Sequence, residues 1–119
     1  MKYFRMTITD TLGFWDDYLS TYTFNPSNSK TFSSWYRVPD DWISDGEVND
    51  ERRETLFRYL YGKTWRMGNG DGSQYIVLES KIDLLTSAEV EQHPWSTTKE
   101  SRYIVDEAGA VTRVEAAAF

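Results

Sequence analysis

Residues 49–62, NDERRETLFRYLYG, decide the fold class, because they have the pattern of a helix between segments that have the composition of strands. Asn49 is suited to the N-cap, and Asp50 and Glu51 place carboxylates at the positive end of the helix dipole. An apolar stripe follows, and Gly62 is suited to the left-handed position after the last turn. We therefore predict one helix over this stretch.

The segments on both sides of this helix are rich in β-branched and aromatic residues. Before it, residues 2–9 and 31–38 (KYFRMTIT and TFSSWYRV) predict two strands. After it, residues 64–67 and 74–82 predict a hairpin around a glycine-rich loop, and residues 101–116 predict a second hairpin that turns at Glu-Ala-Gly. Hairpins favour antiparallel pairing.

Two further helices are predicted. Leu12, Trp15 and Leu19 recur at helical spacing and predict a helix over residues 11–22. The sequence Thr-Ser-Ala-Glu at 86–89 matches a capping box and predicts a short helix.

Together these segments predict an α+β fold, with a mostly antiparallel sheet and two main helices packed on one face. The length predicts a single domain over residues 1–119, with residues 115–119 as a flexible C-terminal tail. Aliphatic residues are few, and aromatics at 16% of the chain supply the core instead.

The composition excludes several kinds of site. The chain has no cysteine, so disulfides, thiolate nucleophiles and zinc ribbons are excluded. It has no apolar run that predicts a signal peptide or a membrane span, and we expect a cytoplasmic protein, in the host cytoplasm if a phage or plasmid encodes it. A net charge of −6 argues against nucleic acid or an anionic membrane as a partner and favours a basic protein.

The acidity is concentrated in residues 40–51, DDWISDGEVNDE, which carry six carboxylates and no Lys or Arg. This segment's formal charge equals that of the whole chain, so the remaining residues are formally neutral. Large apolar side chains inside an acidic stretch favour a protein interface with a polar rim. The candidate partner-binding residues are Asp40, Asp41, Trp42, Asp45, Glu47, Asp50 and Glu51, with Trp35 and Tyr36 as further aromatic candidates.

Other interpretations of the acidic segment stay open. Asp50 and Glu51 can serve only the helix dipole, the loop can be merely solvated, and Trp42 can belong to the core. The ordered spacing of a calcium-binding loop is absent, so no metal site is predicted.

Neither of the other motifs predicts a cofactor or a catalytic site. The glycine-rich loop 68–72 lacks the Gly-Lys-Ser/Thr ending of a phosphate-binding loop and is typical of a turn. His93 is the only histidine, and its place before Pro94 favours a structural role at a helix end. We expect no cofactor and no enzyme, although carboxylate-only catalysis stays open.

The function we expect is a small acidic protein-binding inhibitor that occludes a basic, nucleic-acid-binding surface of its target. In kind, though by no motif, it is similar to phage- or plasmid-encoded anti-defence proteins such as anti-CRISPRs and to DNA mimics. The alternatives are an immunity protein that neutralises a toxin nuclease, and a small-ligand or carbohydrate-binding domain that uses exposed aromatic rings.

Overall fold

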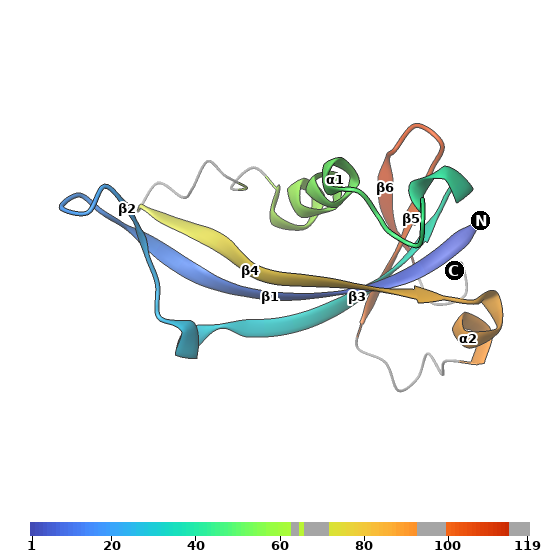
Figure 1. Ribbon diagram of the computed structural model, residues 1–119, viewed down its shortest axis with the longest axis horizontal. Helices are drawn as coiled ribbons and strands as arrows, with labels where there is room; N and C mark the ends of the chain where they lie inside the picture. The colour runs from blue at the N-terminus through green and yellow to red at the C-terminus, as the bar shows by residue number, and fades with distance from the viewer. Residues whose placement is uncertain (63–64, 66–71, 93–99, 115–119) are drawn as a thin grey trace.

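The computed structural model describes residues 1–62, 65, 72–92 and 100–114, and in these it contains a mixed sheet of six strands and two α-helices (Figure 1). The strands are β1 (Lys2–Asp16), β2 (Thr21–Thr23), β3 (Lys30–Val38), β4 (Ser73–Leu85), β5 (Ser101–Val105) and β6 (Val111–Val114). The helices are α1 (Asp50–Tyr61) and α2 (Ser87–Gln92), with short 3-10 turns η1 (Pro26–Asn28) and η2 (Asp40–Trp42).

The 15-residue strand β1 organises the sheet. It pairs antiparallel with β4 along nearly its whole length, from Tyr3↔Leu85 to Phe14↔Ser73. On its other side it pairs antiparallel first with β3 and then, at its far end, with β2. β3 pairs parallel with β5, and β5 pairs antiparallel with β6. The predicted α+β class is confirmed at the level of a single small domain with a mixed sheet and two helices.

The core lies between the sheet and α1. Alternate residues of β1 (Phe4, Met6 and Ile8) are fully buried on one face, as the two-residue period of a strand requires. From α1, Leu56 and Phe57 pack against that face. The remaining buried members of the cluster are Tyr36, Val38, Trp42, Val48, Tyr103 and Val105. Aromatic rings therefore fill much of a core that has few aliphatic side chains.

The predicted boundaries of α1 are confirmed. The Asn49 side chain accepts a hydrogen bond from the Arg52 amide at 2.9 Å, which satisfies a donor that the first turn leaves unpaired. Gly62 ends the helix at φ +64°, ψ −144°, a backbone conformation that is essentially restricted to glycine.

The capping box and the second hairpin are also confirmed. The Thr86 hydroxyl accepts from the Glu89 amide while the Glu89 carboxylate accepts from the Thr86 amide, both at 3.1 Å. Between β5 and β6, the Asp106 carboxylate accepts from the amides of Ala108 and Ala110, each at 2.9 Å. Gly109 supplies the positive φ that this turn needs.

The predicted helix over 11–22 is wrong. β1 continues through Asp16, a turn covers residues 17–20, and β2 returns along β1. The helical spacing of Leu12, Trp15 and Leu19 is outweighed by residues that favour strands, and by β4, which pairs with β1 as far as Phe14. Propensity is local, but this pairing joins residues about 60 positions apart.

Some predicted elements lie wholly or partly outside the described residues. One of these is the hairpin predicted over 64–67 and 74–82. Its second strand is found as β4, which pairs with β1, whereas only Trp65 of its first strand is described. Residues 68–71 of the glycine-rich loop 68–72, His93 and the tail 115–119 are outside as well.

The two helices lie at different places on the sheet. α1 lies over the core face, whereas the six-residue α2 follows β4 at the end of the sheet away from β2 (Figure 1). The molecule measures 52 × 31 × 24 Å, because β1, β2 and β4 extend well beyond α1.

Candidate partner-binding surfaces

The acidic segment begins with two carboxylates that are already paired. Asp40 accepts a 2.7 Å contact from the N-terminal ammonium group, and this hydrogen bond and charge lower the pKa of Asp40. Asp41 lies 3.7 Å from the Arg52 guanidinium, which also donates to the Asp41 carbonyl oxygen. Both side chains are exposed, so each pair is worth little in solvent.

A tight turn then presents the next two carboxylates. Ser44 and Glu47 exchange backbone hydrogen bonds of 2.9 and 3.0 Å. Asp45 and Gly46 lie between them and both have positive φ (53° and 75°). A type I′ two-residue hairpin turn requires positive φ at both of these positions. The turn therefore places Asp45 and Glu47 on a projection with defined backbone hydrogen bonds.

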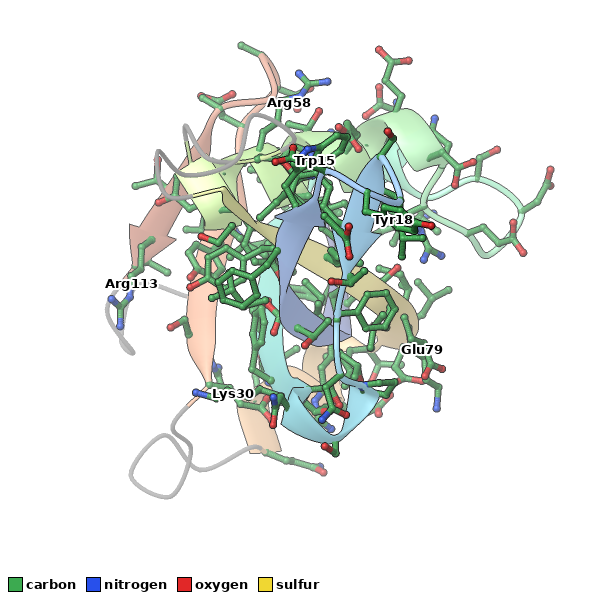
Figure 2. The ribbon with its side chains drawn as sticks, turned by 90° about the vertical axis from the view of Figure 1, so that its left-hand side faces the viewer. Trp15, Tyr18, Lys30, Arg58, Glu79 and Arg113 are labelled. Atoms are coloured by element: carbon green, nitrogen blue, oxygen red, sulfur yellow. The ribbon has the colours of Figure 1, made fainter. Side chains whose placement is uncertain are left out.

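Four carboxylates at this end are exposed and have no ion pair within the described part of the chain. These are Asp45, Glu47, Asp50 and Glu51, which we call the acidic end. Asp50 and Glu51 stand in the first turn of α1, where the helix dipole stabilises negative charge. Figure 2 shows carboxylate-bearing side chains along the loop that leads into α1.

The aromatic residues expected at this surface are buried instead, which corrects their expected role as exposed contacts. Trp42 is 6% exposed and packs in the core, with the Arg52 guanidinium 5.7 Å from its ring centroid. Tyr36 is fully buried, and burial raises its pKa well above the ordinary range. Trp35 is covered on the opposite face of the sheet by Arg102, whose guanidinium lies 4.5 Å from its ring centroid.

A hollow beside the turn supplies an apolar surface that the sequence did not reveal. It has a volume of about 360 Å³ and borders Asp45 and Gly46 directly. Its walls are Lys2, Tyr3, Ile43, Leu84 and Leu85. Ile43 belongs to the predicted segment, whereas Leu84 and Leu85 end β4, about 40 residues later in the chain. The hollow exists only because β4 lies antiparallel to β1 with its end beside Tyr3.

A second exposed surface lies at the far end of the molecule. Its residues are Phe14, Trp15, Tyr18, Leu19 and Phe24, which we call the apolar tip. Tyr18 is 95% exposed and Leu19 57% exposed. Figure 2 shows Trp15 and Tyr18 at the end that faces the viewer, which is the β2 end of Figure 1. Apolar side chains gathered on a surface are typical of an interaction site.

The turn at the tip is ordered by its own carboxylates. The Asp16 side chain accepts a 3.0 Å hydrogen bond from the Leu19 amide, and the Asp17 side chain accepts one of 2.7 Å from the Trp15 indole. Trp15 also packs edge-on against Tyr22, with ring centroids 5.3 Å apart. The predicted helix had included Trp15 among the apolar residues at helical spacing. The run of aromatic and β-branched residues between 11 and 24 is the signal that could have indicated a strand instead.

Two absences hold for the described part of the chain. It contains no group of three or more His, Asp or Glu residues that could hold a metal ion. No helix in it is long and apolar enough to cross a membrane.

Comparison with known proteins gives no relative: no family model, no curated protein and no solved structure matches this chain.

Proposed function

We propose that this chain is an acidic protein-binding inhibitor that occupies a basic, nucleic-acid-binding surface of a target protein. The observation that carries the proposal is the acidic end, where four exposed carboxylates have no ion pair in the described structure and one of them, Asp45, borders a hollow lined mainly by apolar side chains. Exposed unpaired charge of one sign attracts a surface of the opposite sign and speeds association.

The hollow adds a reason for a specific contact rather than general attraction. A Lys or Arg side chain has an apolar stem and a charged head. Inserted between Ile43 and Leu84, its stem would replace water along apolar walls and its head would meet Asp45 at the rim. Basic side chains that otherwise hold nucleic-acid phosphates are suited to this contact, so occupying them would block nucleic-acid binding.

The apolar tip supports a protein-binding role as well. It lies at the opposite end of the molecule from the acidic end (Figure 1), so one partner can be contacted over a long surface, or two partners at once. Neither surface contains a histidine, a cysteine or a buried carboxylate pair of the kind that acid–base or nucleophilic catalysis uses.

The test neutralises the turn and compares it with neutralisation elsewhere. The variant is Asp45→Asn with Glu47→Gln, and the control is Glu79→Gln with Glu107→Gln, which changes the net charge equally at exposed positions outside the acidic end. The target is first recovered by affinity capture from the native host and mass spectrometry. Association kinetics are then measured at low and at physiological salt.

We expect the chain to displace nucleic acid from its target, and we expect the turn variant to associate several-fold more slowly at low salt, with the control close to wild type. If the turn variant associates at the wild-type rate, the acidic end is not the contact surface. If the recovered target keeps its nucleic acid in the presence of a saturating amount of this chain, the inhibitory mechanism is wrong.

A further inference from the structure

A shift of register between β1 and β4 lies where β1 buries two consecutive polar residues. The register between β1 and β4 shifts between Thr9 and Asp10, because Leu78 of β4 has no partner opposite it. Before the shift, alternate residues of β1 are buried and apolar. At the shift, Asp10 and Thr11 are consecutive and both buried, at 8% and 2% exposure. Bulges of this kind re-aim side chains, often beside functional sites.

The same stretch of β1 has an opening beside it. Pairing with β3 ends at Asp10↔Lys30, and pairing with β2 begins only at Phe14↔Thr23. Between these two points a cavity of about 440 Å³ lies against β1, β3 and β4. Its lining includes Asp10, Thr11, Asn28, Lys30, Phe32 and Tyr75. Ligand cavities in proteins typically measure about 300–1,000 Å³.

Two polar groups at this cavity keep hydrogen-bonding capacity that the described residues do not satisfy. Asp10 accepts a 2.5 Å hydrogen bond from the Tyr61 hydroxyl, and in the described structure no cation lies within ion-pair distance of its carboxylate. The Thr11 hydroxyl is buried with no hydrogen-bond partner among the described residues. A buried polar group without a partner lowers stability, and buried polar groups are nearly always bonded. The Thr11 hydroxyl therefore has hydrogen-bonding capacity, unused by the described residues, that a bound molecule can take up.

The surroundings of these groups indicate the chemistry of that ligand. Asp10 and Lys30 oppose each other in charge, so the lining carries no net formal charge and suits a neutral molecule. A hydroxyl group can donate to the Asp10 carboxylate and accept from Lys30 or the Asn28 amide at the same time. Tyr75 and Phe32 add aromatic rings, against which the C–H face of a ring-shaped molecule can pack.

We propose that this cavity binds a small neutral polyol of the monosaccharide class. Asp10 and Thr11 hold its hydroxyl groups, Lys30 and Asn28 bond those nearer the opening, and Tyr75 and Phe32 flank its apolar face. The site is separate from the acidic end, so the proposal stands or fails independently of the inhibitory function.

The first test uses named probes on the full chain. Glucose, galactose, mannose and N-acetylglucosamine are titrated separately, each to about 50 mM, a range that detects weak millimolar binding. Backbone amide NMR shifts are followed, with glycine and inorganic phosphate as charged comparison probes. We expect at least one sugar to shift amides of residues 10–12 and 30–32 in a saturable way. The proposal is overturned if none of the four sugars does so, or if only glycine or phosphate does.

The second test removes the unpaired hydroxyl without changing the shape of the side chain. Thr11→Val should weaken sugar binding at least tenfold, the loss expected when one good hydrogen bond is removed. It should leave the melting temperature equal or higher, because it removes a buried hydroxyl that has no partner in the described structure. The matched control Thr112→Val, at an exposed position, should change neither property.

A third variant keeps the proposal testable if Thr11→Val does not fold. Lys30 is exposed, so Lys30→Gln preserves the core while it removes a charged group from the lining. We expect weaker sugar binding by Lys30→Gln than by Lys81→Gln, which removes an exposed lysine outside the cavity lining. Equal binding by these two variants, or unchanged binding by a folded Thr11→Val, contradicts the assignment of the site.

Discussion

Two tyrosine hydroxyls are held in their protonated form by the fold. Burial is the largest cause of the raised pKa of Tyr36. For Tyr61, burial again acts first, and the hydrogen bond to Asp10 and the charge of that carboxylate raise the pKa further. An unfolded chain releases tyrosine protons near pH 10. The folded chain retains these two protons above that pH, so the free energy of unfolding falls as the pH rises beyond about 10.

Tyr36→Phe should therefore reduce the loss of stability in alkali. The phenylalanine ring can keep the stacking on Phe4 and Tyr103, whose centroids lie 5.0 and 5.3 Å away. Each retained proton contributes a slope of at most about 1.4 kcal/mol per pH unit above pH 10. We expect urea unfolding at pH 8 and pH 11 to show a smaller difference for this variant than for wild type. Tyr18→Phe, at a fully solvated position, serves as control, and an equal slope in all three proteins would contradict the prediction.

At this scale the sequence indicates which residue types are unusual, but not which side chains reach solvent. The carboxylates of the predicted segment are exposed, whereas Trp35, Tyr36 and Trp42 are buried. Chain neighbours such as Asp41 and Trp42 differ completely in exposure, because Trp42 packs against residues of α1 and the sheet that lie elsewhere in the chain. The hollow beside Asp45 was unpredictable for the same reason, since β4 supplies part of its wall.

Among the elements, the features set by local hydrogen bonds were predicted. The strands over 2–9, 31–38 and 74–82 were predicted as strands, but their long-range pairing was not. The boundaries of α1, the capping box of α2 and the turn after β5 each depend on residues within four positions of one another. The strand character of residues 11–16 depends on β4, and the parallel pairing of β3 with β5 joins segments about 65 residues apart. A local periodicity cannot report either pairing.

The cap of α1 can be tested directly. Asn49→Ala removes the side-chain oxygen that accepts from the Arg52 amide, and such a change typically costs about 1 kcal/mol of stability. The loss should appear as a lower urea midpoint with an unchanged dependence on urea concentration. Glu107→Ala, in an exposed turn, should stay within about 0.5 kcal/mol of wild type. Equal stability of Asn49→Ala and Glu107→Ala would show that the cap contributes nothing.

On the scale of the whole molecule, the charged acidic end and the apolar tip are separated along its length. The acidic end lies where the chain enters α1, and the apolar tip lies at the β2 end of the sheet, which α1 does not cover (Figure 1). At this net charge, repulsion between molecules opposes association through the exposed apolar tip. The cost is repulsion within the molecule wherever like charges are gathered.

The charges of Asp45 and Glu47 should therefore lower stability, and their neutralisation should raise it. Asp45→Asn with Glu47→Gln removes two of four neighbouring charges, and asparagine tolerates the positive φ of residue 45. At low salt we expect the free energy of unfolding to increase by about 0.3–0.5 kcal/mol, and at 1 M NaCl the difference should vanish because charges there are screened within about 3 Å. Glu79→Gln with Glu107→Gln changes the net charge equally but relieves less repulsion, so its gain should be smaller. If these carboxylates stabilise the fold, the variant will instead be less stable than wild type. If they serve binding at a cost in stability, the variant will be more stable and will associate more slowly with the target.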